Sequence, residues 1–399
     1  MNQTSFSIDD PRINLPPNRY SVLQQDAFDL LSLSDKQRSC VPGPEPVIGP
    51  LRQRLVQRHT EMPRTRIPVS EPDLSGNERR YVNECIETGW ISSAGPFIEK
   101  FERAFAKFAD THYAISCSSG TAALHLALKA LGVGPGDEVI VPAFTMIAVP
   151  NAVVYCGATP VLVDVTPDDY NIDCDLLQDA VTPRTKGVIV VHTYGHPARM
   201  RDILRIARRF GLFVLEDAAE AHGAMFEGVR IGSLGTIAAF SFYGNKTLAT
   251  GEGGMVVCND QELSTVVRTL RDHAFTPERH FWHNYFGFNY RMTNLQAAVG
   301  LAQTERGNQL VRARREVAQL YTALLKDINW LRLPREREGC YSSFWMYAVE
   351  VLSNAPASRD DIRRQLAAFG IETRGYFVPI HLQPIYFAAN RGVQMPVSE

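Results

Sequence analysis

Residues 240–254, FSFYGNKTLATGEGG, place one lysine, Lys246, between two apolar segments. GTIAAFSF (235–242) leads into the stretch and GGMVVCND (253–260) leads out of it, and both are typical of buried strands. A lysine between two buried strands either is desolvated at a cost in free energy or works as an amine. The stretch predicts two core strands and makes Lys246 the first candidate for chemistry.

Strands and helices alternate before this stretch. We interpret four short apolar segments as strands: 138–142, 159–165, 187–195 and 212–223. Segments with apolar residues at helical spacing lie among them: 99–109, 121–132 and 201–211. Buried strands that alternate with helices indicate an α/β protein whose central sheet is mostly parallel, with helices on both faces.

The chain divides into three parts. Residues 1–65 are rich in proline, and we interpret them as a partly disordered extension that the chemistry does not need. Residues 66–305 form the predicted large domain. Residues 306–399 form a smaller C-terminal α/β domain, with a long helix at 305–325, a strand at 343–352 and a helix at 358–374.

Composition excludes several classes of partner. The 399 residues carry a net charge of −2, which gives no sign of a nucleic acid or an anionic membrane surface as partner. No apolar run approaches the roughly 20 residues of a membrane helix, and the N-terminus lacks a signal-peptide pattern. The seven cysteines are dispersed, without a CxxC pair. We expect a cytoplasmic protein without a metal site.

Polar residues at strand ends outline a candidate site. Asp217 closes the apolar segment LFVLED, where a buried carboxylate needs a cationic partner, such as a protonated ring nitrogen. The structural alternative is a buried salt bridge or a helix cap. Ser119, Gly120 and Thr121 directly precede a helix, where exposed amides and hydroxyls could bind an anion or simply cap the helix. Ser241 could supply a further hydroxyl to the same anion.

A phosphate cradle, a buried carboxylate and a buried lysine are the three anchors that pyridoxal 5'-phosphate requires. Amides and hydroxyls hold the phosphate, an aspartate pairs with the ring nitrogen, and a lysine bonds to the aldehyde. In this chain they occur in the order cradle, Asp217, Lys246, which is the order of fold-type I pyridoxal-phosphate enzymes. The residues therefore predict such an enzyme.

Four longer motifs resemble the DegT/DnrJ/EryC1/StrS family of sugar aminotransferases: VHTYGHPARM, EDAAEAHGA, FSFYGNKTLATGEGGMV and GFNYRMTNLQAAVGLAQ. The resemblance runs from about Ile67 to the end of the chain. It implies that a nucleotide-linked 4-keto-6-deoxyhexose receives an amino group from L-glutamate, in a homodimer with shared active sites. YGHP and FWHNYFGFNYRMTN are most similar to the branch that aminates GDP-4-keto-6-deoxymannose.

The resemblance also assigns cofactor roles. Lys246 matches the lysine that bonds to the cofactor, Asp217 the partner of the ring nitrogen, and Glu220 a residue near the ring hydroxyl. The phosphate contacts fall on Ser119, Gly120, Thr121 and Ser241, and on Asn289 of the neighbouring subunit, with Arg291 as second candidate. Many relatives carry an aromatic residue where Met146 stands. We expect Met146 to cover the ring, with Phe144 as the alternative.

Substrate contacts are expected from two segments. Tyr194 and His196 follow a strand that should open toward the cofactor, whereas His192 there could equally be strand-end packing. The second segment contributes His283 and Arg291, and Arg279 and Arg291 could receive the phosphates of the nucleotide sugar.

Three alternatives remain open from the sequence. The substrate could be a dTDP- or UDP-linked keto sugar, or a cyclitol or aminobenzoate precursor. The chain could also be a regulatory protein that keeps the fold without turnover. The family's dehydratase branch replaces the lysine by a histidine, so Lys246 argues against it. Relatives extend some tens of residues further, so we expect the C-terminal domain to be incomplete.

Overall fold

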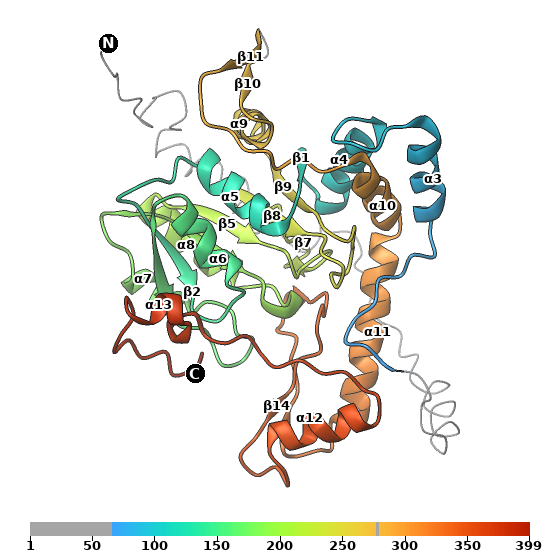
Figure 1. The fold of residues 1–399 in the computed structure, drawn as a ribbon. Helices are drawn as coiled ribbons and strands as arrows, with labels where there is room; N and C mark the ends of the chain where they lie inside the picture. The colour runs from blue at the N-terminus through green and yellow to red at the C-terminus, as the bar shows by residue number, and fades with distance from the viewer. Residues whose placement is uncertain (1–65, 277–278) are drawn as a thin grey trace.

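A seven-stranded sheet forms the centre of the computed structural model, which describes residues 66–276 and 279–399 (Figure 1). In spatial order its strands are β1 Tyr113–Cys117, β9 Gly254–Cys258, β8 Ile237–Ser241, β5 Phe213–Asp217, β4 Thr185–Val191, β2 Glu138–Pro142 and β3 Thr159–Val163. β9 is antiparallel to both of its neighbours, and the other neighbouring pairs are parallel. The predicted mostly parallel sheet is confirmed. The predicted extension, residues 1–65, lies outside the described residues.

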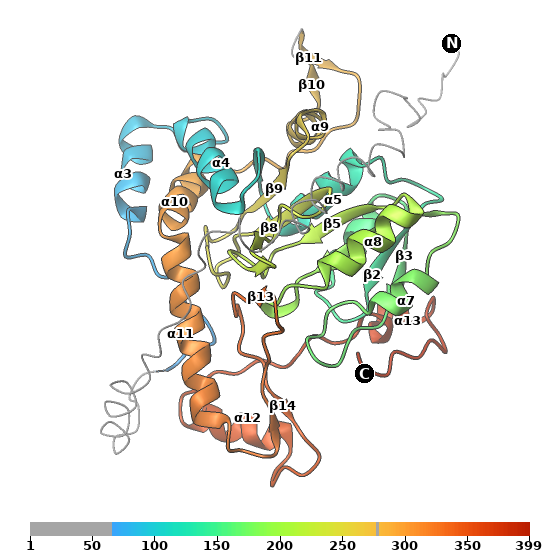
Figure 2. The same cartoon turned by 180° about the vertical axis from the view of Figure 1, so that it is seen from behind.

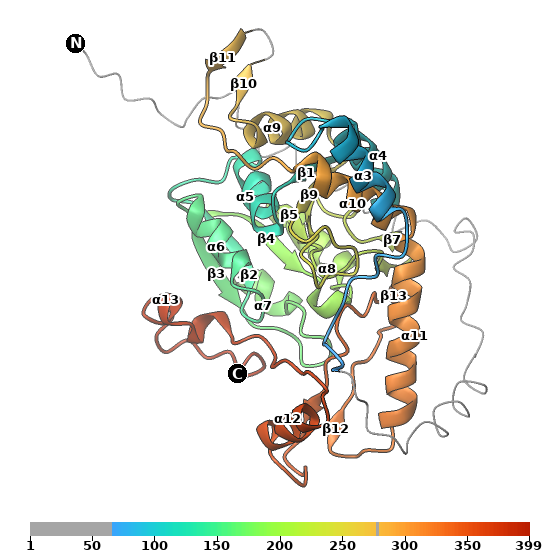
Figure 3. The same cartoon turned by 45° about the vertical axis from the view of Figure 1, so that its right-hand side comes forward.

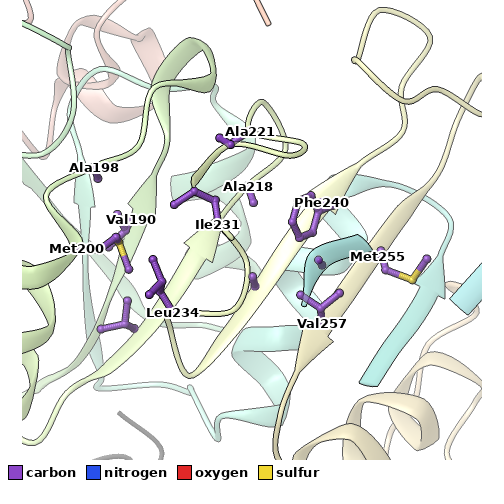
Figure 4. Packing of buried hydrophobic residues seen from close by; sticks show 14 of the residues in the cluster. Val190, Ala198, Met200, Ala218, Ala221, Ile231, Leu234, Phe240, Met255 and Val257 are labelled. Atoms are coloured by element: carbon purple, nitrogen blue, oxygen red, sulfur yellow. The ribbon is translucent and has the colours of Figure 1, made fainter. Parts of the chain in front are cut away.

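Alternate residues of the central strands belong to two hydrophobic clusters. In β4, Val188 and Val190 belong to one cluster, part of which Figure 4 shows, and Ile189 and Val191 belong to the other. Successive side chains of a strand point to opposite faces of the sheet. The clusters therefore lie on opposite faces, which explains why the strands are continuous apolar runs in the sequence.

Helices complete both clusters (Figures 1 and 2). The face with Ile189 is covered by α5 Gly120–Ala130, α6 Ala148–Tyr155 and α9 Gln261–Arg271. The face with Val190 is covered by α3 Glu78–Thr88, α4 Pro96–Ala109, α7 Cys174–Asp179, α8 Met200–Phe210 and α10 Asn294–Glu305. The helices predicted at 99–109, 121–132 and 201–211 correspond to α4, α5 and α8.

The strand predicted at 187–195 is wrong beyond Val191. The short helix η2, Thr193–Gly195, follows β4, and Tyr194 there has a φ of 54°. The N–H of Thr193 donates to Asn171 Oδ1 (3.0 Å), and the N–H of Tyr194 donates to Glu220 Oε2 (2.8 Å). Side chains thus take the hydrogen bonds that a strand would give to its neighbour. The strand predicted at 212–223 likewise ends at Asp217.

A smaller unit packs at the C-terminal end of the long helix α11, Gly307–Leu325 (Figure 1). It contains the antiparallel pair β12 Leu331–Arg332 and β14 Glu350–Val351, followed by α12 Arg359–Ala368. The strand predicted at 343–352 is wrong apart from β14, because the N–H of Ser343 donates to Gly195 O (3.0 Å) and Phe344 turns the chain with a φ of 46°.

The last residues return to the large unit, where η3 Ile380–Leu382 and α13 Pro384–Phe387 lie near the β2–β3 edge (Figure 3). The N–H of Ile380 donates to Ala143 O (2.8 Å), and the N–H of Ser398 donates to Asp164 Oδ1 (2.9 Å). At the other end, Ile67 is hydrogen-bonded to Gly370 and Glu372 of the smaller unit. Residue 305, where the sequence predicts the domain boundary, is the last residue of α10, and the division into domains stays a prediction.

Three short strands connect the units, since β13 Cys340–Tyr341 pairs with β6 Met225–Phe226, which pairs with β7 Val229–Arg230. A two-stranded hairpin, β10 Phe275–Thr276 and β11 Arg279–His283, projects from the body (Figure 1). Within the described ranges, no helix is long and apolar enough to cross a membrane, and no three His, Cys, Asp or Glu side chains group as a metal site would need.

Candidate active site

The carboxyl ends of β4, β5 and β8 and the start of α5 frame the candidate site. β5 ends at Asp217, β8 ends at Ser241 and α5 begins at Gly120. A Cβ atom on Gly120 would lie 2.7 Å from Ser241 Cβ, so the helix start abuts the end of β8. Open α/β sheets bind their ligands at this edge.

Lys246 lies in the turn after β8, where its N–H donates to Tyr243 O (2.8 Å). Its side chain is 11% exposed, and its Nζ lies 3.8 Å from Glu220 Oε1. Burial lowers the pKa of the Lys246 amine, and the carboxyls of Glu220 and Asp217 partly oppose this effect. A lysine with a lowered pKa is more readily available as a free amine, which is the nucleophilic and basic form.

Two buried carboxyl groups, of Glu220 and Asp217, interact electrostatically with this amine. Glu220 Oε2 accepts the N–H of Tyr194 (2.8 Å), and burial raises the pKa of Glu220 to about 7. Asp217 Oδ1 accepts the N–H of Ala219 (3.0 Å), and burial raises the pKa of Asp217 as well. The charge of Lys246 favours the ionised form of both carboxyls. The three groups therefore titrate as one interacting set.

The start of α5 combines a cap with unpaired amides. Ser119 Oγ accepts the N–H of Ala122 (3.1 Å), as the capping alternative predicted. The hydroxyl accepts through a lone pair and keeps its own proton to donate. The N–H groups of Gly120 and Thr121 lie in the first turn, where the helix offers no carbonyl partner. This end can therefore cap the helix and still bind an anion.

Met146 and Phe144 differ in how much of each side chain is exposed and able to contact a ligand. Met146, just before α6, is 51% exposed, whereas Phe144 is 3% exposed. The Phe144 ring packs with Tyr170 and Tyr194, at centroid distances of 5.4 and 6.2 Å. Met146 is thus the better placed of the two to cover a ring, and this assignment stays a prediction.

The residues after β4 face different neighbours. Tyr194 is joined to Glu220 through its N–H, and its ring stacks on Phe377 (5.4 Å). His196 is buried, with Nδ1 3.0 Å from Pro197 O and Nε2 accepting the N–H of Arg337 (3.1 Å). Tyr194 therefore belongs to the Lys246 site, and both His196 ring nitrogens already contact the protein.

His192 follows the packing alternative. Its Nε2 lies 3.1 Å from Glu216 Oε2, and its Nδ1 accepts the N–H of Ala198 (3.1 Å). Because Nδ1 accepts a hydrogen bond, it carries no proton. The ring proton is therefore on Nε2, which donates to Glu216.

His283 ends strand β11 of the projecting hairpin, and Asn289 and Arg291 follow it in the chain. Arg291 donates to Asp272 Oδ1 (2.9 Å) and to Asn289 Oδ1 (3.1 Å), while His283 Nδ1 lies 2.8 Å from His273 O. The side chain of Arg279 lies outside the described part of the structure. Tyr290 O accepts the N–H of Ser118 (2.8 Å), so this segment passes the start of α5.

Sequence reasoning missed Trp345, which contacts Lys246 directly. The Lys246 Nζ lies 3.8 Å from the centroid of the Trp345 ring. Trp345 stands in SSFWMYAVEV, whose apolar residues predicted an ordinary strand. A lone tryptophan about 100 residues further along the chain carries no local signal of this contact.

These residues fit pyridoxal phosphate. The buried Lys246 amine could bond to the aldehyde of the cofactor, and the carboxyl of Asp217 could pair with its ring nitrogen. The free amides of α5 and the Ser241 hydroxyl could bind its phosphate. β8 and α5 approach so closely that position 120 has no room for a Cβ, which is consistent with a tight phosphate-binding site. Such a site on a mostly parallel sheet defines the class of fold-type I pyridoxal-phosphate enzymes.

The protein belongs to the DegT/DnrJ/EryC1/StrS aminotransferase family, whose model matches residues 72–399. GDP-perosamine synthase of Caulobacter vibrioides is 50% identical over 322 residues, 80% of this chain and 87% of that protein. GDP-perosamine synthase of Escherichia coli O157:H7 is 44% identical, with 80% and 87% covered. Among solved structures, the fold resembles that of DesV from S. venezuelae with a TM-score of 0.76. The two sequences are 37% identical, and the match covers 81% of this chain and 85% of the DesV chain.

Family membership confirms the predicted enzyme class and cofactor. The protein is a sugar aminotransferase that depends on pyridoxal phosphate.

Proposed function

We propose that the protein converts GDP-4-keto-6-deoxymannose to GDP-perosamine, with L-glutamate as amino donor. The observation that carries this proposal is the 50% identity to the Caulobacter vibrioides enzyme, which extends over 87% of that relative. The product would serve polysaccharide or O-antigen synthesis in the cytoplasm.

Lys246 is the proposed catalytic residue. Pyridoxal phosphate, when bound, supplies an electron sink for the negative charge that develops at the reacting carbon. Lys246 Nζ would hold the cofactor before the reaction and, as a free amine, would carry the proton to the C4 carbon of the sugar. Its lowered pKa suits both tasks, because each requires the free amine. Asp217 would hold the proton of the ring nitrogen, and Glu220 would lie beside the ring hydroxyl.

The remaining proposed roles are those that the resemblance to the family implies. Gly120 and Thr121 offer amides to the cofactor phosphate, Ser119 and Ser241 offer hydroxyls, and Met146 covers the ring. The nucleotide sugar is contacted by Tyr194, His196, His283 and Arg291. Since both ring nitrogens of His196 face protein groups, its contact with the sugar would use the ring face.

We further propose a homodimer with shared active sites. The segment that carries His283 and Arg291 has strongly exposed aromatic side chains, with Phe281 75% and Phe286 83% exposed. Exposed apolar surface of this kind is typical of an interface, and a second copy of the chain would cover it. Asn289 or Arg291 would then complete the phosphate site of the neighbour.

The substrate assignment is tested by comparing kcat/KM for GDP-4-keto-6-deoxymannose and dTDP-4-keto-6-deoxyglucose, with L-glutamate in both assays. We expect the GDP sugar to be favoured by at least about tenfold, because a tenfold ratio needs only about 1.4 kcal/mol of differential binding. A tenfold preference for the dTDP sugar would refute the proposal and leave the sugar-aminotransferase class intact. Lys246→Ala should abolish turnover, whereas the exposed Lys107→Ala should not.

A further inference from the structure

The indole ring of Trp345 lies directly against the Lys246 amine. The Nζ is 3.8 Å from the ring centroid, and Trp345 is only 7% exposed. An ammonium group over the face of an aromatic ring is attracted by the ring's quadrupole, most strongly where water is excluded. Glu220 Oε1 approaches the same Nζ at 3.8 Å. The amine therefore has two protein contacts in place of bulk water.

The same indole is attached to the backbone of the lysine segment. Trp345 Nε1 donates to the carbonyl of Asn245 (2.8 Å), the residue before Lys246. Ser70 Oγ donates to that carbonyl as well (3.1 Å). The ring position is thus set relative to Lys246 itself, so a shift of the lysine segment would carry the ring with it.

Arg314 of α11 closes this network. Its guanidinium donates to Trp345 O and to Ser70 Oγ, both at 3.0 Å. None of the ion pairs among residues 66–276 and 279–399 includes Arg314, although burial lowers its pKa. A half-buried cation with only neutral hydrogen-bond partners is partly desolvated without a charge to offset the cost, which fits a positioning role.

We propose that Trp345 is a positioning residue that receives the Lys246 amine whenever this amine is not bonded to the cofactor. The inference rests on the proposed role of Lys246 and adds to it. Transamination requires the amine to be released and later to return. An aromatic face attracts the ammonium form without a titratable group of its own, so it can hold the amine near the reacting carbon without accepting its proton.

The first test measures Lys246 in the cofactor-free protein. Trinitrobenzenesulfonate labels free amines, and mass spectrometry of the Lys246 peptide gives the labelling rate at pH 8. Trp345→Leu removes the ring face, so we expect about tenfold faster labelling. Trp345→Phe keeps a smaller aromatic face, so its labelling rate should lie between those of the wild type and Trp345→Leu. Trp330→Leu, at a tryptophan just before β12, is the matched control and should label like the wild type.

Labelling of Trp345→Leu at the wild-type rate would overturn the proposal. Should this variant fail to fold by circular dichroism, Arg314→Met decides. It keeps the indole and its bond to Asn245 O, and it removes the hydrogen bonds that Arg314 donates to the Trp345 carbonyl and to Ser70 Oγ. We expect about threefold faster labelling of Lys246 in that variant, and an unchanged rate would again overturn the proposal.

The second test separates positioning from a general loss of structure. In the loaded enzyme, Trp345→Leu should lower kcat about tenfold and leave KM for both substrates within about twofold. A change confined to KM would overturn the proposal. If Lys246→Ala were fully active, the proposed catalytic role of Lys246 would fail, whatever the labelling rates of the Trp345 variants are. The substrate assignment is tested separately, by the comparison of the GDP- and dTDP-linked sugars.

Discussion

Glu220 is a buried carboxyl group whose titration makes folding stability depend on pH. Burial raises its pKa from 4.5 to about 7. Between these values the unfolded chain releases a proton that the folded protein keeps, so this group's contribution to stability falls as pH rises through the range. Well above pH 7 the full destabilisation by the ionised Glu220 applies, and below pH 4.5 this group no longer destabilises the fold.

We therefore expect Glu220→Gln to stabilise the cofactor-free protein at pH 8 and to have little effect at pH 4.5. Urea unfolding at both pH values measures the difference, and the exposed Glu252→Gln serves as control. The amide oxygen of glutamine can still accept the N–H of Tyr194, so the comparison isolates the charge. Equal shifts at the two pH values would contradict burial as the cause.

Asp217 offers a test of charge at constant shape. Asp217→Asn keeps an oxygen that accepts the N–H of Ala219 and loses the carboxylate proposed to hold the ring nitrogen's proton. We expect kcat to fall about 100-fold or more, which corresponds to about 3 kcal/mol of transition-state stabilisation. Turnover within a few-fold of the wild type would count against the role.

At the scale of elements, the contact between the start of α5 and the end of β8 predicts a strict need for glycine at position 120. A Cβ there would lie 2.7 Å from Ser241 Cβ, so Gly120→Ala must separate the two elements that carry the proposed phosphate contacts. We expect affinity for pyridoxal phosphate to fall more than about tenfold, because the amides and the hydroxyl would lose their common geometry.

The matched control is Gly134→Ala, since a Cβ on Gly134 would meet no atom within 4 Å. Titration of the cofactor-free proteins with pyridoxal phosphate, followed by absorbance, gives both affinities. Similar affinities for the two variants would show that the close approach of α5 and β8 is not required.

At the scale of the whole molecule, the question is whether Arg291 serves its own active site or that of a second copy. Tyr290 O contacts Ser118 of the same chain, while Phe281 and Phe286 are exposed on the same segment. We expect inactive Lys246→Ala and weakened Arg291→Ala chains to regain activity when they are mixed and allowed to exchange subunits. In such a mixed dimer, one site receives both native residues only if the site is shared.

Activity of the mixture is compared with the sum of the separate variants after mild dissociation and reassembly. The recovered activity should approach about one quarter of wild type, because half of the dimers are mixed and each has one complete site. A mixture no more active than the sum of its components would place Arg291 in its own chain's site.

The sequence by itself determined the α/β class, the central strands and the burial of Lys246. Each depends on local periodicity: apolar segments flank Lys246, and an apolar strand ends at Asp217. Such patterns persist in the fold because a sheet covered on both faces must bury both sides of its strands. The cap and the free amides of α5 were likewise readable from Ser119, Gly120 and Thr121, since they depend on one helix end.

Only the tertiary structure decided what surrounds the Lys246 amine. Ser70 and Trp345 come from distant segments and both donate to the Asn245 carbonyl, and Arg314 from a third segment donates to each of them. The apolar pattern around Trp345 predicted a strand, yet Ser343 nearby bonds to Gly195 and the indole turns to Lys246. Periodicity reports whether a side chain is buried but not which distant group it is buried against, because that choice is made by the packing of the whole chain.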